Sequence, residues 1–127
     1  MTPEFPIDFE MPLPPRELQP NHRCHWRAKA RAVKLYRNVA CGVVLGTFIP
    51  NEPLGSLLVQ ATFYHASKRR RDRDNLLASL KAAFDGMTDA GLVADDSLMV
   101  HLPVKTEIDR DNPRVVIRIA EGEFSGI

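Results

Sequence analysis

Two aspartates separated by one residue are the strongest candidates for chemistry in this sequence. Asp72 and Asp74 lie within the run Lys68-Arg69-Arg70-Arg71-Asp72-Arg73-Asp74-Asn75. In an extended segment, side chains two residues apart point to the same side, so the two carboxylates can share one cation. Mg²⁺ prefers oxygen ligands, and Mn²⁺ accepts them as a substitute. The pair therefore predicts a divalent metal site that activates water to hydrolyse a phosphodiester.

A second acid pair, Asp95-Asp96, follows the segment that begins at Asp74 and is a candidate to complete the metal ligands. The intervening sequence predicts a helix of about 15 residues, which is roughly 22 Å long. The second pair must therefore fold back along or across that helix to reach the first.

The tetrapeptide Asp-Arg-Asp-Asn occurs twice, at residues 72 to 75 and at residues 109 to 112. Spacing alone therefore does not identify a metal site, and the first copy also fits a solvated loop with salt bridges. Context separates the copies, because the first follows four cations and opens an apolar-striped segment. The second precedes Pro113 and a strand-like run, which predicts a turn.

The net charge is only +1, but the charges are unevenly distributed, with no acid between Glu17 and Glu52. A basic surface beside carboxylates suits a nuclease, because cations hold phosphates while the acids hold a metal. We predict DNA contacts for Asn21, Arg23, Arg27, Lys34, Lys68, Arg69, Arg70, Arg71 and Arg73. The alternative for the cations near residue 30 is an ordinary soluble helix face. Trp26 either stacks on DNA or packs into the core.

The length of 127 residues predicts one domain spanning residues 1–127. Cys24 and Cys41 fit free thiols in a reducing compartment, and no apolar stretch approaches the roughly 20 residues of a membrane span. We expect a soluble, cytoplasmic protein without an organic cofactor. A zinc site at His22, Cys24 and His25 is the weaker alternative, because no second ligand pair has a usual spacing.

Hydrophobic periodicity predicts the order strand, helix, strand, helix, strand, strand. The fold class is α/β (α+β), a mixed sheet of about four strands with two main helices packed on it. The expected elements are a strand at 5–13, a helix at about 25–44, a strand at 54–64, a helix from about 74 to 90, and strands at 98–108 and 115–120.

Several boundary residues are specific expectations. In the first helix, Gly46 ends the segment and the apolar stripe is Ala32, Leu35, Tyr36, Val39 and Val43. The second helix begins with Asp74 or Asn75 as its N-cap, ends at Gly91, and has the stripe Leu77, Leu80, Phe84 and Met87. The last two strands are expected to form a hairpin.

Taken together, these motifs resemble the RusA family of Holliday junction resolvases. The resemblance rests on Arg70-Arg71-Asp72-Arg73-Asp74-Asn75, Lys81-Ala82-Ala83-Phe84-Asp85, Ala90-Gly91 and Asp95-Asp96. It is close from about residue 69 to residue 100 and looser elsewhere. It implies a small mixed α/β homodimer, often from phages and prophages, that binds branched DNA and nicks it symmetrically with Mg²⁺.

The resemblance also implies the functional residues. The essential acids fall on Asp72, Asp74 and Asp96, with Asp95 an adjacent candidate. The essential lysine falls on Lys81 when it is matched through Lys-Ala-Ala-Phe-Asp, but on Ala78 when it is matched from the aspartates. We favour Lys81, because three residues are close to one helical turn.

Three alternatives stay open at this point. Lys81 could be an ordinary surface partner of Asp85, four residues away. The protein could bind branched DNA without cutting it, since the lysine is displaced. It could also be a nuclease that prefers a flap, a replication fork or a plain duplex.

Overall fold

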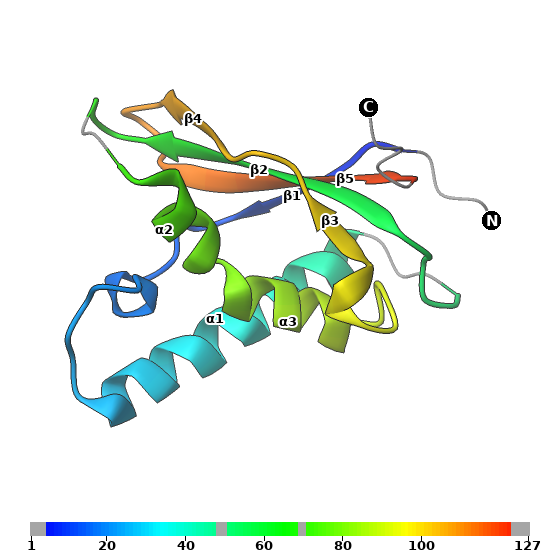
Figure 1. Ribbon diagram of the computed structural model, residues 1–127, viewed down its shortest axis with the longest axis horizontal. Coiled ribbons are helices and arrows are strands. Elements are labelled where there is room, and N and C mark those ends of the chain that lie inside the picture. Colours follow the sequence, from blue (N-terminus) through cyan, green and yellow to red (C-terminus); the bar gives the residue numbers. More distant parts are fainter. Residues whose placement is uncertain (1–4, 48–50, 69–70, 123–127) are drawn as a thin grey trace.

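The computed structural model describes residues 5–47, 51–68 and 71–122. A mixed sheet is packed on one face by helices, which confirms the expected fold class (Figure 1). Along the chain the elements are β1 (Ile7–Met11), η1 (Arg16–Leu18), α1 (Trp26–Thr47), β2 (Leu57–His65), α2 (Arg73–Ala78), α3 (Lys81–Asp89), η2 (Asp96–Leu98), β3 (Met99–His101), β4 (Lys105–Ile108) and β5 (Arg114–Glu121).

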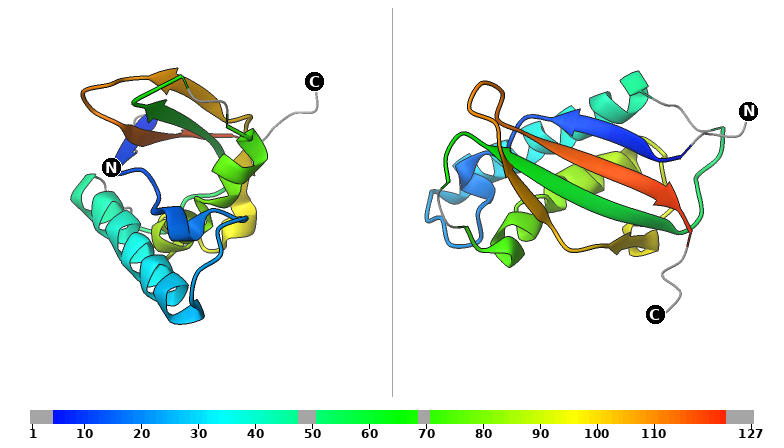
Figure 2. Two further views of the ribbon diagram at one scale, coloured as in Figure 1. Left: turned by 90° about the vertical axis from the view of Figure 1, so that its left-hand side faces the viewer. Right: turned by 90° about the horizontal axis from the view of Figure 1, so that it is seen from above.

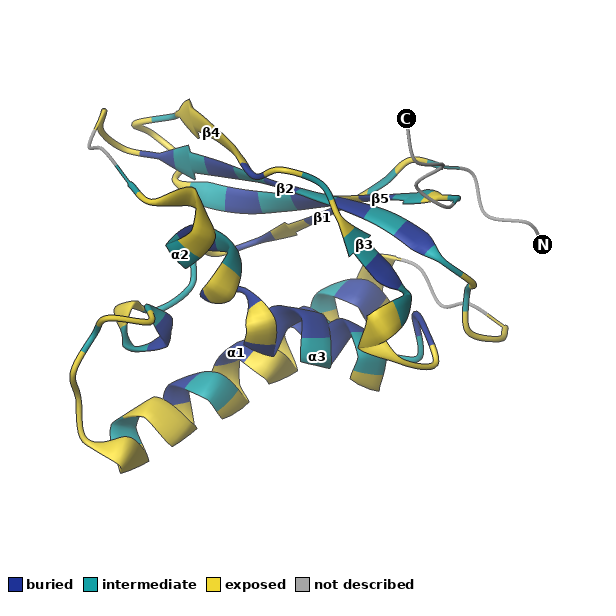
Figure 3. Ribbon diagram, in the orientation of Figure 1, coloured by how far each residue is buried: buried dark blue, intermediate teal, exposed yellow. Residues whose placement is uncertain are grey.

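The sheet is centred on β2, which pairs with three other strands. The strand order is β1-β5-β2-β3, and β4 also pairs with β2. β5 lies antiparallel to both β1 and β2, whereas β3 and β4 both run parallel to β2. Residues along β2 alternate between buried and partly exposed, as Figure 3 shows. The buried set faces the helices, and the opposite face of the sheet is left open (Figure 2).

Helices α1 and α3 pack closely enough that only glycine fits at one contact. A Cβ atom on Gly86 would lie 2.1 Å from the Arg37 carbonyl oxygen. The Arg37 guanidinium also donates two hydrogen bonds to the Asp89 carboxylate across the same interface. This contact fixes α3 against α1, and thereby fixes the segment that carries the candidate site.

The predicted apolar stripe of α1 was partly wrong. The buried residues are spaced by four, at Ala32, Tyr36, Ala40 and Val44, whereas Leu35 and Val39 are 65% and 38% exposed. Each of the two exposed residues precedes a buried one, which displaces it by roughly 100° around the helix axis. Gly46 also does not end the helix, which continues to Thr47.

The predicted terminal hairpin was wrong. β4 and β5 lie on opposite sides of β2, so the loop between them passes the end of β2, where the Asp109 N–H donates to the His65 carbonyl. The expected strand at 98–108 is divided into β3 and β4, giving five strands rather than about four. Pro103 lies at the division, and proline cannot donate a hydrogen bond to the ladder.

The predicted second helix is divided into α2 and α3 at Ser79-Leu80. The Leu80 N–H donates to the Leu77 carbonyl, three residues back, and the Leu80 side chain is fully buried. The tighter turn changes the helix direction and still buries the predicted residues Leu80, Phe84 and Met87. Gly91 ends the segment as expected, with a φ of 85° that suits glycine.

Candidate active site

Asp72 begins α2 by capping it, which differs from the expected cap at Asp74 or Asn75. Its Oδ1 atom accepts hydrogen bonds from the backbone N–H groups of Asp74 (2.9 Å) and Asn75 (3.3 Å). Such a cap satisfies N–H groups that lack a partner in the first turn. Asp74 therefore lies in a helical turn, so the argument that an extended segment aligns the two carboxylates was wrong.

Both aspartates still keep carboxylate oxygens that no neighbour occupies. Among the residues that the structure describes, Asp72 Oδ2 and both oxygens of Asp74 make no hydrogen bond or ion pair. Both residues are exposed. Oxygens in this state are open to an external cation.

The second acid pair folds back to the beginning of α3. Asp95 Oδ1 accepts a hydrogen bond from the Ser97 N–H at 2.9 Å, which lowers the pKa of Asp95 and starts η2. This turn brings Asp96 Oδ2 to 3.8 Å from Lys81 Nζ. The lysine also donates to Asp85 Oδ1 at 3.3 Å, so the helical pair and the contact with Asp96 coexist.

Lys81 and Asp96 border a hollow of about 220 Å³ that Ala78 also lines. Ala78 and Lys81 are the two positions that compete for the family's lysine. A lysine at either position would therefore face the same hollow, and the assignment to Lys81 stays a prediction.

His101 also lines this hollow, and no sequence pattern predicted it. Its ring packs on Phe84 with the ring centroids 4.5 Å apart. Burial lowers the pKa of His101, while the Asp96 carboxylate acts in the opposite direction. No local motif marks this histidine, because β3 brings it to the site only through its pairing with β2.

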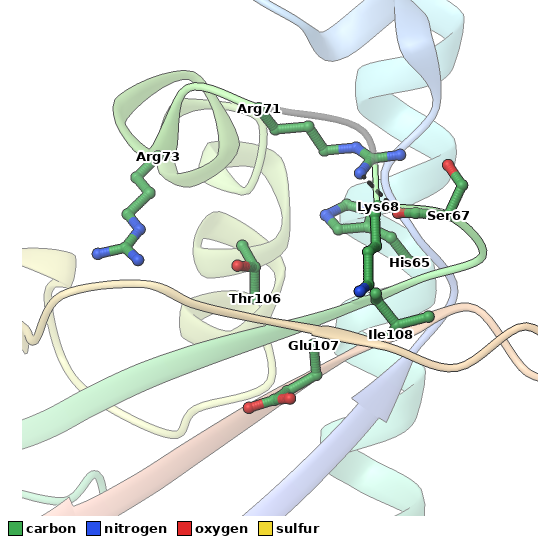
Figure 4. A pocket seen from close by; sticks show the side chains of 8 residues that line it. All are labelled: His65, Ser67, Lys68, Arg71, Arg73, Thr106, Glu107 and Ile108. Atoms are coloured by element: carbon green, nitrogen blue, oxygen red, sulfur yellow. Dashed lines mark hydrogen bonds between the residues drawn. The ribbon is translucent and has the colours of Figure 1, made fainter.

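Two hollows adjoin the beginning of α2, and both are lined by basic residues. One, of about 490 Å³, is bordered by Asp72 and by Arg16 and Gln19 from the N-terminal loop. The other, of about 570 Å³, is drawn in Figure 4 and is lined by His65, Ser67, Lys68, Arg71, Arg73, Thr106, Glu107 and Ile108. His65 and Arg71 line both. The sequence predicted Lys68, Arg71 and Arg73 here but missed Arg16 and His65, and Arg69 and Arg70 lie outside the described residues.

The remaining predicted DNA contacts lie before and on α1. All of them are exposed: Asn21, Arg23, Arg27 and Lys34. In Figure 1 the loop before α1 and the start of α1 lie toward the same end of the molecule as α2. Trp26 is 68% exposed, which excludes the core alternative. The Arg27 guanidinium lies 5.2 Å from the centroid of its ring, so an aromatic face and a cation are presented together.

Within residues 5–47, 51–68 and 71–122, no three or more histidine, cysteine or acidic side chains converge as a group that could hold a metal ion. The zinc alternative at His22, Cys24 and His25 therefore gains no support. The magnesium set of Asp72, Asp74, Asp95 and Asp96 stays a prediction.

Comparison with known proteins assigns the family. The chain matches the profile described as Endodeoxyribonuclease RusA over residues 20–120. The chain belongs to the RusA family of endodeoxyribonucleases. The match covers both acid pairs, Lys81, the predicted DNA contacts and both main helices, which confirms the resemblance and supports a nuclease that acts on DNA.

A relative in Xylella fastidiosa strain Temecula1 is 35% identical over 114 residues. The alignment covers 86% of this chain and 72% of the relative, which is named only as an uncharacterized protein. No helix among the described residues is both long enough and apolar enough to cross a membrane.

Proposed function

We propose that this RusA-family protein is a Mg²⁺-dependent, structure-specific endonuclease that resolves Holliday junctions by paired, symmetric nicks. The observation that carries the proposal is the return of Asp96 to Lys81, with 3.8 Å between Oδ2 and Nζ. The two residues are distant in sequence, and the resemblance to the family assigns an essential acid to Asp96 and favours Lys81 over Ala78 for the essential lysine. Their proximity has no evident role in the core, because the side chains of Lys81 and Asp96 are 73% and 47% exposed.

The carboxylates fit a magnesium ion by their chemistry, because they supply unoccupied hard oxygen atoms. Asp72 and Asp74 would hold the ion, with Asp96 or Asp95 as further ligands, and Mn²⁺ would be an acceptable substitute. When bound, the ion would supply an activated water and neutralise charge on the phosphate. Asp72 also keeps α2 in place through its cap, so one residue links the local fold to the site.

Lys81 is proposed to bind the scissile phosphate. Its ammonium group is placed between Asp85 and Asp96 and is held at the hollow by both. The side chain is 73% exposed, so a phosphate oxygen can reach Nζ without the displacement of buried groups. The lysine would then orient the phosphodiester and offset its charge beside the acids.

The exposed cations near the start of α2 and the start of α1 are proposed to bind the arms of the DNA junction. Lys68, Arg71 and Arg73 line a hollow at the start of α2. Arg27 lies beside Trp26, and Arg23 is exposed in the loop before them. Cations bind phosphates without regard to sequence, and an exposed indole can stack on a base. This combination suits a substrate that is recognised by its shape.

A homodimer follows from the symmetry of the proposed substrate. Each chain carries one set of candidate acids, and paired nicks require two sites that are related by a two-fold axis. The non-catalytic alternative is favoured by one observation, the lack of a converged ligand group among the described residues. A preference for flaps or forks is the other alternative.

The test is cleavage of a mobile four-way junction with Mg²⁺, with Mn²⁺ and with excess EDTA, beside matched flap, fork, duplex and single-stranded substrates. We expect symmetric nicks in the junction that need a divalent ion. Salt-dependent binding of the junction without any cleavage would instead support the non-catalytic alternative. Faster cleavage of flaps or forks would overturn the junction assignment but keep the nuclease.

A further inference from the structure

His65 at the end of β2 is buried without an evident structural reason. It is 7% exposed, and its Nε2 atom has no hydrogen-bond partner among the residues that the structure describes. Its ring stacks on Phe63, with the ring centroids 5.8 Å apart and an angle of 16° between the planes. A phenylalanine would make the same stack, and an unsatisfied buried nitrogen costs free energy. The nitrogen therefore calls for a partner from beyond the described residues.

The surroundings of His65 indicate what that partner is. The hollow beside it is lined by three cations, Lys68, Arg71 and Arg73, and by the hydroxyl residues Ser67 and Thr106. Figure 4 shows His65, Ser67, Lys68 and Arg71 gathered on one side of this hollow, with Arg73 across from them.

One acid, Glu107, also borders this hollow. Glu107 also lines a second hollow on the open face of the sheet, where Lys105 is another lining residue. Among the described residues that line the hollow, three are cations and one is an acid, which favours an anion there.

His65 is suited to donate a hydrogen bond to such an anion. Burial and the positive charge of Arg71 both lower the pKa of His65, so the imidazole is neutral at physiological pH. A neutral imidazole carries one N–H donor, which matches a phosphate oxygen that accepts. The His65 hydrogen bond would orient the bound anion, while the neighbouring cations would offset its negative charge.

We propose that this hollow binds a backbone phosphate of the DNA, with His65 Nε2–H as a direct donor and with Lys68, Arg71 and Arg73 around it. The inference rests on the proposed function, since it assumes a DNA strand at this end of the molecule. Asp72 borders the adjoining hollow, which shares His65 and Arg71. A phosphate fixed here would set the register of the strand relative to the acids, so His65 is a positioning residue.

The experiment compares His65→Phe with His65→Gln in binding a labelled four-way junction without divalent ions. The Phe variant keeps the stack and removes the donor, whereas Gln keeps an N–H donor. We expect His65→Phe to weaken binding roughly tenfold, since a hydrogen bond to a charged group is lost. We expect His65→Gln to retain most of the affinity.

Salt dependence separates the donor from the cations. His65→Phe removes no charge, so the slope of log K against log salt should be unchanged, whereas Lys68→Gln should reduce it by about one. A scan of single methylphosphonates along the junction should find one phosphate whose neutralisation weakens the wild type but adds little to His65→Phe. That position would identify the bound phosphate.

A merely structural histidine predicts a different pattern. His65→Phe would then bind the junction as tightly as the wild type, which would overturn the inference while the proposed function stands. If the wild-type protein does not bind junctions at all, both the inference about His65 and the proposed function are contradicted.

The inference also has a test that needs no variant. Titration of inorganic phosphate into protein carrying ¹⁵N-labelled histidine should shift the His65 Nε2 resonance, while chloride at equal ionic strength should not. Equal responses to the two salts would contradict the inference.

Discussion

The two copies of Asp-Arg-Asp-Asn, at residues 72–75 and 109–112, adopt the same local motif in different settings. In the first, Asp72 Oδ1 accepts from the N–H groups two and three residues ahead, at 2.9 and 3.3 Å. In the second, Asp109 Oδ1 accepts from the equivalent groups, both at 3.2 Å. The tetrapeptide thus dictates its own backbone, and it does so whether or not a functional site is present.

The difference lies in the other oxygen of each leading aspartate. Asp109 Oδ2 accepts a hydrogen bond from Arg114 at 2.8 Å, and this contact lowers the pKa of Asp109. Asp72 Oδ2 has no such partner in the described part of the chain. The second copy is a closed structural turn, while the first leaves a carboxylate oxygen open at a hollow that Arg16, His65 and Arg71 also line.

The largest effect on cleavage is expected at Asp72, and the corresponding residue of the second copy, Asp109, serves as its control. Asp72→Asn keeps an oxygen for the cap but removes the charge, so junction cleavage should fall by roughly a thousandfold or more while binding persists. Asp109→Asn, the matched control, should cleave at nearly the wild-type rate. Asp72→Ala should in addition lower the free energy of unfolding by about 1 kcal/mol, measured by urea denaturation. Equal cleavage by the two Asn variants would break the distinction between the copies.

The next largest effect is expected for Lys81. Lys81→Ala should slow cleavage by roughly a hundredfold, because a group that orients the phosphate and offsets its charge is lost. The double variant Ala78→Lys/Lys81→Ala should recover part of that rate, since both positions line one hollow. Asp85→Asn is the control, because it removes only the helical partner of Lys81. If Asp85→Asn were as slow as Lys81→Ala, the lysine would be a structural partner instead.

A smaller effect should appear in the stability that Asp109 provides. Its pKa lies below the usual 3.8 because Arg114 donates to it, so its contribution is complete above that value and is lost as pH falls through the folded pKa. Asp109→Ala should therefore lower Tm at pH 7, and the difference from wild type should shrink toward pH 3. Thermal melts across this range measure the effect. A difference that grows as pH falls would contradict the assigned pair.

Much of the fold followed from the sequence, because the strand alternation, the long first helix and the Gly91 stop are local patterns. The terminal hairpin did not, since the choice of β2 as the shared neighbour of β4 and β5 depends on contacts between distant residues. The division of the second helix depends on the burial of Leu80, which periodicity alone does not reveal.

The candidate site was predictable to the same extent. Its acids and Lys81 came from motifs. The sequence required Asp95-Asp96 to fold back to Asp72 and Asp74, whereas the structure brings Asp96 to Lys81, and no group of three potential metal ligands converges among the described residues. His65, His101 and Arg16 carry no motif. They reach the site only because strand pairing and the N-terminal loop bring them there.

The most direct test of the central claim compares Asp74→Asn with Asp111→Asn in single-turnover cleavage of a four-way junction with Mg²⁺. The two residues hold the same place in identical tetrapeptides, and in neither does the side chain cap the turn. We predict that Asp74→Asn binds the junction but does not nick it, and that Asp111→Asn does both at the wild-type rate. Nicking by Asp74→Asn at the wild-type rate would contradict the placement of the active site at the first copy.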